Sequence, residues 1–252
     1  MNMKAMILAA GYGMRLRPYT EKIPKALVKI NNTPLLELVI RKLINAGVTQ
    51  IIINTHHLAD QIKSFLKERK NFGISIELSF EPEILGTGGG LKIASRFLKN
   101  EAPFFLYNVD IVSTMVLQHF YRFHLTHQSI ATLAVNHRKT TRYFLMDESG
   151  YICGHEDVSN NLVRLKRNPN GQLHRMGFCG IHVISPEIFN FMTRQGRFSI
   201  VDVYLDLIEA GLPVIGYPID QFYWKDIGKL HTLNEIQSEI ASGKLDFEEL
   251  FR

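Results

Sequence analysis

The feature that most constrains the fold is a short apolar run near the start of the chain. Residues Lys4–Ala10 are almost wholly apolar, which predicts a strand buried on both faces of a parallel sheet. Helical periodicity over Pro34–Ala46 and Asp60–Lys70 then alternates with further short strands at Ile51–Asn54 and Ile74–Phe80. This β-α-β-α-β order predicts an α/β fold, a Rossmann-like three-layer α/β/α arrangement around a mixed, mainly parallel central sheet.

The loop after the first strand carries almost no side-chain bulk. Ala9, Ala10 and Gly11 stand in a row, and Gly13 follows. Such a loop lets a ligand lie against the backbone and accept hydrogen bonds from its N–H groups, which suits a phosphate or a flat base. An ordinary glycine turn is the alternative. A dinucleotide-binding fingerprint would need a third glycine where Leu16 stands, and the Gly-Lys-Ser/Thr of a P-loop is absent.

Basic residues are concentrated in the same loop. Arg15, Arg17, Lys22, Lys25 and Lys29 all lie between residues 15 and 29. A proline directly precedes Lys25 and an apolar run follows it, so this lysine is expected to be held toward a site. Solvated surface charges are the alternative reading of the cluster.

The run L-A-A-G-x-G-x-R-L-x-P-x-T-x-x-x-P-K-x-L-V, present from Leu8 to Val28, resembles the signature of the sugar-1-phosphate nucleotidylyltransferases. The chain looks most like their single-domain members that act on mannose-, heptose- or N-acetylmuramate-type 1-phosphates. The resemblance implies a nucleotidyltransferase fold and an enzyme that joins a nucleoside triphosphate to a sugar 1-phosphate, with release of pyrophosphate. It also implies that Arg15 and Lys25 are catalytic.

A second glycine-rich segment, residues 81–90, is expected to be a loop that opens a helix over Leu91–Leu98. A flexible connector is the alternative. In the family this region closes over the base, so the resemblance implies that Glu81, Gly86 and Gly88 bind the nucleotide together with the first loop. A carboxylate only accepts hydrogen bonds, so Glu81 would suit the two adjacent edge donors of guanine better than the single ring N–H of uracil or thymine. Backbone groups could equally read the base, with Glu81 facing solvent.

Two aspartates are candidate metal ligands. Asp110 follows the apolar strand Phe104–Asn108, where an unpaired carboxylate is costly and so implies a cation or hydrogen-bond donors nearby. Asp226 lies in a segment similar to the family's tryptophan-x-aspartate-x-glycine. The resemblance implies that Asp110 and Asp226 hold Mg²⁺. A helix cap is the alternative for each. The family usually has glycine where Val109 stands, so a slight shift of the backbone is expected there.

The second half of the chain predicts a small antiparallel lobe, built on a hairpin of Arg142–Asp147 and Tyr151–Cys153. Residues 157–173 are polar and are expected to form an irregular, mobile flap. Two departures from the family lie in this half. Arg167-Asn168-Pro169 replaces its common Glu-Lys-Pro, and Phe178-Cys179 stands where many relatives have a sugar-binding asparagine. The sugar acceptor therefore stays undefined.

The helix expected over Met115–His127 carries His119, His124 and His127, for which we expect solvated or capping roles. The two cysteines, Cys153 and Cys179, are too few for a disulfide framework or a zinc site and are expected in or near the core.

Composition sets broader limits. The chain has 252 residues, which we interpret as a single domain with a nucleotide-binding half (1–112), a sugar-phosphate-binding half (113–228) and a C-terminal helical tail (229–252). The net charge of +5 is dispersed, which suits anionic small substrates and argues against nucleic acid as a partner. Without a signal peptide or a membrane-spanning run, the expected location is the cytoplasm. Both a monomer and a homodimer are compatible with the sequence.

Three rival functions stay open. The chain could bind nucleotide sugars as a sensor without turnover, or transfer the nucleotidyl group to a non-sugar phosphorylated alcohol. A hydride-transferring dehydrogenase is the weakest rival, because the third glycine and the appropriately spaced acidic residue are missing.

Overall fold

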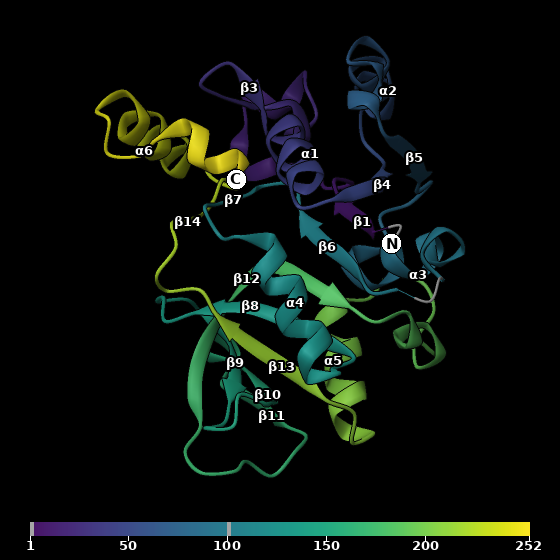
Figure 1. Cartoon of the computed structure of the whole chain (residues 1–252), viewed down its shortest axis with the longest axis vertical. Helices are drawn as coiled ribbons and strands as arrows, with labels where there is room; N and C mark the ends of the chain where they lie inside the picture. The colour runs from purple at the N-terminus through teal and green to yellow at the C-terminus, as the bar shows by residue number, and fades with distance from the viewer. Residues whose placement is uncertain (1–2, 100–101) are drawn as a thin grey trace. The chain divides into compact units, whose positions relative to one another are not determined.

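The computed structural model describes residues 3–99 and 102–252. Most of its helices and strands are labelled in Figure 1. The alternation of strands and helices confirms the predicted α/β class with a mixed sheet. No helix in the described part of the chain is both long enough and apolar enough to cross a bilayer.

The chain divides into two compact units. The first unit consists of Met1–Ile84, Leu106–Gln118 and Phe222–Arg252, and the second of Leu85–Phe105 and His119–Gln221. Because the chain leaves the first unit and returns to it twice, that unit combines segments from the start, the middle and the end of the sequence. The division into a nucleotide half, a sugar half and a tail stays a prediction.

The first unit contains parallel strands and two short antiparallel pairs. Its strands, including the one that enters it from the second unit, are β1 Met3–Leu8, β2 Lys29–Ile30, β3 Thr33–Pro34, β4 Val48–Thr55, β5 Ser75–Phe80, β6 Phe104–Asn108, β7 Ile111–Ser113 and β14 Trp224–Asp226. The order runs β6-β1-β4-β5, and the pairs β1–β4 and β4–β5 are parallel. The buried middle of β1 (Ala5, Met6, Ile7) explains its continuous apolar run.

The helices of this unit match the sequence periodicity closely. They are α1 Leu35–Asn45, α2 Ala59–Glu68 and α6 Leu230–Ala241. Pro34 precedes the first turn of α1. Gly47 follows the C-cap of this helix and has a positive φ of +97°, which glycine adopts readily. The order β1-α1-β4-α2-β5 confirms the predicted β-α-β-α-β arrangement.

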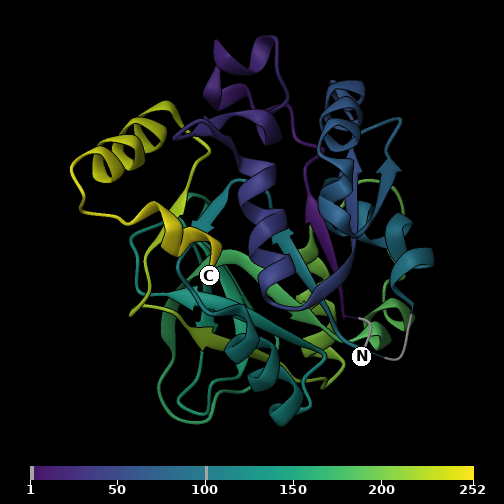
Figure 2. The ribbon, with the colours of Figure 1, turned by 45° about the horizontal axis from the view of Figure 1, so that its top comes forward.

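The end of the chain packs on its own unit. A short 3-10 helix, η7 Phe247–Phe251, lies beside α1 (Figure 2). The Asn45 side-chain amide donates to the backbone oxygen of Phe251 at 2.8 Å, and the Lys42 ammonium donates to that of Arg252.

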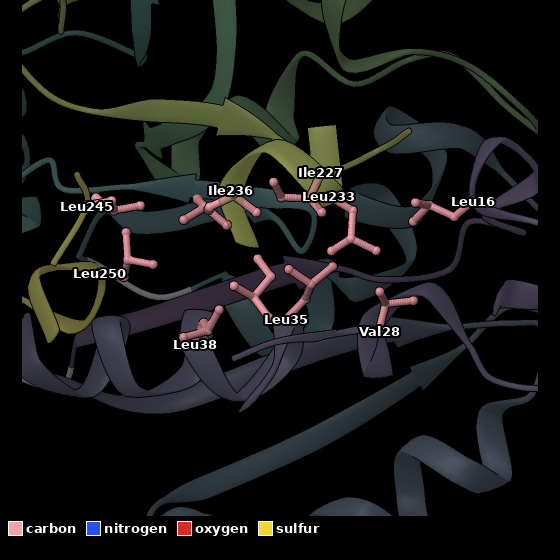
Figure 3. Close-up of a cluster of buried hydrophobic side chains, with 11 residues drawn as sticks. Leu16, Val28, Leu35, Leu38, Ile227, Leu233, Ile236, Leu245 and Leu250 are labelled. Atoms are coloured by element: carbon pink, nitrogen blue, oxygen red, sulfur yellow. The ribbon is translucent and has the colours of Figure 1, made fainter. Parts of the chain in front are cut away.

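One apolar cluster joins the three segments of the first unit (Figure 3). Leu16 and Val28 come from the first loop, and Leu35 and Leu38 from α1. Ile30 of β2 also belongs to it. The remaining members come from the middle and the end of the chain, namely Val112, Ile227, Leu233, Ile236, Leu245 and Leu250. Burial of these side chains fixes the first loop against α6 and the C-terminal segment.

The second unit contains a mainly antiparallel sheet and its own helices. They are β8 Ala131–Asn136, β9 Arg142–Met146, β10 Ile152–Asp157, β11 Leu162–Leu165, β12 His174–Ile184, β13 Val214–Pro218, α3 Gly86–Leu98, most of α4 Leu117–His127, and α5 Ile200–Glu209. β9 and β10 are antiparallel, as the hairpin prediction requires. β8 pairs with β13 in parallel and with β12 antiparallel.

The glycine-rich segment is not a bare loop. α3 already begins at Gly86, so the expectation that the helix starts at Leu91 is wrong. A Cβ on Gly88 would come within 2.5 Å of the Phe198 ring, and one on Gly86, at φ +72°, within 2.6 Å of the Phe198 carbonyl. That carbonyl accepts the N–H of Gly88 at 3.0 Å. Glycine is thus required for close packing of the first helical turn, which sequence spacing does not reveal.

Two further expectations for the second unit need correction. Residues 157–173 are not irregular throughout, because β11 pairs with β10. His124 is not solvated: it is buried, and its ring nitrogens lie 2.8 Å from the hydroxyl of Thr132 and 3.0 Å from that of Ser185. Both cysteines are buried and free, as expected.

Candidate active site

The first loop is a chain of short 3-10 turns held by its own backbone. Gly13 has φ +66°, and its carbonyl accepts the N–H of Leu16 and the hydroxyl of Thr20, each at 2.8 Å. A Cβ on Gly13 would lie 2.9 Å from the Thr20 methyl and 3.0 Å from the Lys25 Cβ. The glycine therefore lets the turn close directly over the base of the Lys25 side chain.

Lys25 begins the turn η3 Lys25–Leu27 and forms an ion pair with Asp110. Pro24 fixes the entry to this turn, and the Lys25 carbonyl accepts the N–H of Val28 at 3.1 Å. Both members of the ion pair are largely buried, with side-chain exposures of 14% for Lys25 and 16% for Asp110. A pair so removed from water interacts more strongly than a surface salt bridge.

Asp110 and Asp226 are brought together by backbone pairing. β7 and β14 are antiparallel, with Asp226 opposite Ile111, and the Asp110 carbonyl accepts the N–H of Ile227 at 2.8 Å. Val109 donates its N–H to the Leu8 carbonyl at 3.2 Å and is not among the residues with positive φ. The backbone at this position therefore does not require the glycine usual in the family.

Asp226 lies in an electrostatically unfavourable position. Burial raises the pKa of its carboxyl, and the negative charge of Asp110 raises it further, while Lys25 and Arg15 act in the opposite direction. Its Oδ1 is buried and has no hydrogen-bond partner within the described residues. A buried carboxylate oxygen without a donor favours a bound cation.

Gly228 makes room for this arrangement. A Cβ at this position would lie 2.6 Å from an Arg15 guanidinium nitrogen and 2.6 Å from Oδ1 of Asp226. The Arg15 head group and the Asp226 carboxylate thus both border the space that a side chain would occupy. Gly228 was recognisable as part of the tryptophan-x-aspartate-x-glycine motif, but its role was not predicted.

A polar chain links the first strand with Glu81. The Ala9 N–H donates to Oδ1 of Asn54, and the Asn54 side-chain amide donates to Oε1 of Glu81, each at 2.7 Å. Asn54 is 3% exposed and Glu81 only 1%, so Glu81 does not face solvent. Asn54 was not among the predicted site residues, although a polar residue at the end of a buried strand was a signal visible in the sequence.

This chain of bonds also changes what the first loop can offer a ligand. The Ala9 N–H already donates to Asn54 and is not available to a ligand. The space beside Gly11 is open, because a Cβ on Gly11 would meet no atom within 4 Å. Ala10 is buried. His56 packs against the loop: its ring nitrogens lie 2.8 Å from the Glu81 carbonyl and 3.1 Å from the Tyr12 hydroxyl.

The predicted site residues therefore fall into two sets. The first unit brings Arg15, Lys25, Asp110 and Asp226 into one charged cluster, and it also contains Glu81 and the loop Ala9–Gly13. Gly86 and Gly88 belong to the second unit, where they pack on Phe198.

The charged cluster is compatible with a divalent cation. No three His, Cys, Asp or Glu residues gather into a metal site within residues 3–99 and 102–252. Two repelling carboxylates, one with an unpartnered oxygen, nevertheless suit Mg²⁺, which typically takes one or two protein carboxylates and completes its shell with water and phosphate oxygens.

The chain is similar to known proteins over most of its length. A family model described as nucleotidyl transferase matches residues 4–243. A mannose-1-phosphate guanyltransferase of Pichia angusta is 32% identical over 230 residues, with 90% of this chain and 61% of the relative covered. A UTP–glucose-1-phosphate uridylyltransferase of Synechocystis is 31% identical over 251 residues, with the same two shares covered. The chain thus spans about three fifths of the length of these curated relatives.

Solved structures share the fold. A UDP-glucose pyrophosphorylase complexed with UDP-glucose gives a TM-score of 0.78 at 18% identity, covering 96% of this chain and 100% of the other. HddC from Yersinia pseudotuberculosis, complexed with GMP-PN, gives 0.75 at 20% identity, covering 94% and 99%. The predicted Rossmann-like fold is confirmed by these likenesses.

Proposed function

The chain belongs to the nucleotidyl transferase family, and we propose that it transfers a nucleotidyl group from a nucleoside triphosphate to a sugar 1-phosphate, with release of pyrophosphate. The observation that carries this proposal is the cluster of Arg15, Lys25, Asp110 and Asp226, assembled within one unit from three distant segments. Two cations and two carboxylates at one place suit a reaction between two phosphates.

The reaction requires an oxygen of the sugar phosphate to attack the α-phosphorus in line with the departing pyrophosphate. Both partners are anions, so positioning and charge neutralisation supply most of the catalysis. Lys25 turns from Asp110 to the triphosphate, and Arg15 binds its phosphates from the same loop. No general base is needed, because the attacking phosphate is already ionised near neutral pH.

Asp110 and Asp226 would hold Mg²⁺, which would supply further neutralisation of the phosphate charge when bound. The antiparallel pair β7–β14 keeps the two carboxylates at a fixed separation. The space beside Gly228 keeps Arg15 close to Asp226, so the positive head group limits the repulsion between the two carboxylates.

For the nucleotide we propose binding along Ala9, Ala10, Gly11 and Gly13, with Glu81, Gly86 and Gly88 at the base. We propose GTP as the donor and a mannose-type 1-phosphate as the acceptor. Mannose-1-phosphate guanyltransferases recur among the relatives, and the Asn54 amide orients the Glu81 carboxylate, an acceptor suited to the two edge donors of guanine. We also propose a cytoplasmic location, which cell fractionation would test. A monomer and a homodimer are both compatible with the proposed function.

The experiment is Mg²⁺-dependent pyrophosphate release, with GTP, UTP, dTTP, CTP and ATP crossed against a panel of sugar 1-phosphates. Phosphocholine is included as a non-sugar acceptor. Asp110→Asn serves as the inactive variant, and Asp60→Asn, an exposed aspartate of α2, as the matched control. We expect one strong pair that is lost in Asp110→Asn and kept in Asp60→Asn. Nucleotide binding without release for any pair would support a sensor instead.

A further inference from the structure

The first loop is tied to Glu81 by two separate hydrogen-bond paths. One path is described above and runs from the Ala9 N–H through the Asn54 side chain to Oε1 of Glu81. The other begins at the Tyr12 hydroxyl, which lies 3.1 Å from Nε2 of His56. It ends at the Glu81 carbonyl, 2.8 Å from Nδ1 of the same imidazole. All of these residues belong to the first unit.

The strand pairing explains why one histidine reaches both partners. β4 and β5 are parallel neighbours, with Thr55 opposite Phe80 at their last positions. His56 and Glu81 directly follow these two strands. The Glu81 N–H donates to the Thr55 carbonyl at 2.8 Å, so the main chain of Glu81 is held beside the end of β4, within reach of the imidazole.

The two bonds define which nitrogen of the neutral His56 ring carries the proton. A carbonyl oxygen only accepts hydrogen bonds, so Nδ1 must donate to Glu81. Nε2 of the neutral ring is then an acceptor, and the Tyr12 hydroxyl donates to it. His56 thus joins a donor on the loop to an acceptor on the main chain of Glu81.

The Tyr12 side chain is exposed and nevertheless fixed. Tyr12 is 48% exposed, and its ring meets that of His56 edge-on, with the centroids 5.3 Å apart and the planes at 82°. The His57 ring adds a tilted contact at 5.6 Å. Tyr12 stands between Gly11 and Gly13, where the backbone loses the most freedom on ordering. The bond to His56 therefore restrains the loop where its backbone is freest.

The two bonds of His56 have different consequences for a nucleotide. The bond to Tyr12 orders the loop whose backbone N–H groups suit a phosphate, a group that every nucleotide carries. The bond to Glu81 fixes the main chain of the carboxylate that is proposed to read the base. A site that is ordered before its ligand arrives avoids part of the entropy cost of binding.

We propose that His56 is a positioning residue that prepares both parts of the nucleotide site. Through Tyr12 it orders the loop for the phosphates, and through Glu81 it aligns the carboxylate for guanine. This role rests on the nucleotide site and the function proposed above. The two effects should separate, because each depends on a different ring nitrogen.

The two ring nitrogens can be replaced one at a time. The side-chain amide of asparagine takes the place of Nδ1, and that of glutamine takes the place of Nε2. His56→Asn therefore keeps the bond to Glu81 and loses the bond to Tyr12, whereas His56→Gln does the reverse. His57→Asn and His57→Gln are the matched controls, because this neighbouring histidine lies outside both hydrogen-bond paths.

Binding is measured by displacement of N-methylanthraniloyl-GTP with unlabelled GTP or UTP, in the presence of Mg²⁺ and without an acceptor. His56→Asn should weaken binding of GTP and UTP alike by about three- to tenfold, the effect of one hydrogen bond. Tyr12→Phe should reproduce this loss, and combining the two changes should cost nothing more. His56→Gln should weaken GTP by a similar factor and leave UTP unchanged. Both His57 variants should bind as wild type does.

A histidine with a merely structural role would not separate GTP from UTP. Equal losses of both nucleotides in His56→Gln, or wild-type affinity in His56→Asn and Tyr12→Phe, would refute the positioning role and leave nucleotide binding intact. A wild type that binds neither nucleotide would refute the proposed function, and the positioning role with it. Circular dichroism checks folding, and Tyr12→Phe, which removes one oxygen from an exposed side chain, keeps the test valid if a His56 variant fails to fold.

A spectroscopic test requires no ligand. NMR of the imidazole nitrogens at alkaline pH should find the proton of the neutral His56 ring on Nδ1. Tyr12→Phe should leave it there, because the Glu81 carbonyl still requires a donor. A proton on Nε2 in wild type would remove the acceptor assigned to Tyr12 and overturn the proposal.

Discussion

Gly228→Ala tests the charged cluster without removing any functional group. The glycine has no positive φ, so alanine meets no backbone strain. Its methyl group, however, would lie 2.6 Å from an Arg15 nitrogen and 2.6 Å from Oδ1 of Asp226, where ordinary contact begins at 3.4 Å. Both charged groups must therefore withdraw by most of an ångström.

The magnitude follows from that displacement. A misplacement of about 1 Å in a catalytic group costs on the order of a hundredfold in rate. The Arg15 side chain is long and exposed and can yield part of the way, so we expect kcat/KM to fall by about 10- to 100-fold. This corresponds to about 1.4 to 2.7 kcal/mol of transition-state stabilisation.

Pyrophosphate release measures the effect, and a double-mutant cycle assigns it. In an Arg15→Ala background the added methyl has only Asp226 to displace, so Gly228→Ala should cost clearly less there than in wild type. Thermal unfolding serves as the control for folding. An unchanged kcat/KM in folded Gly228→Ala, or equal costs in both backgrounds, would refute the geometric argument.

Three further predictions concern other groups. Lys25→Ala should lower kcat by orders of magnitude while circular dichroism stays native, and near-normal turnover would rule out a catalytic Lys25. Glu81→Gln should raise the KM for GTP about tenfold with little change for UTP, which competition between the two nucleotides measures. Burial lowers the pKa of Lys42 from 10.5 to about 8, so the unfolded chain binds more protons between these values and stability should rise with pH across that window, by about 2 to 3 kcal/mol. Urea unfolding of wild type and Lys42→Met at both ends of the window checks this, and an equal rise in both proteins would contradict it.

The local elements of this fold were predictable because their signals are local. Apolar runs and helical periodicity located β1, α1, β4 and α2 to within a few residues. The residues of the charged cluster were also named in advance, since the motif around Lys25 and the aspartates after strands are visible in the sequence.

The errors arose where a distant residue decides the local structure. Phe198, more than a hundred positions along the chain, packs on Gly86 and Gly88 and allows α3 to start early. The burial of His124 depends on hydroxyl groups of Thr132 and Ser185 that helical spacing does not reveal. Asn54 likewise acquires its role only through Ala9 and Glu81.

The interleaved first unit has a consequence for synthesis on the ribosome. Leu16 and Val28 are made early, but their partners Ile227 and Leu233 are made only after every residue of the second unit. The second unit can therefore complete its chain first, while the first loop waits without its apolar cover. The charged cluster becomes complete only when Asp226 has emerged, so a chain arrested before that point would carry Lys25 and Asp110 without the second carboxylate.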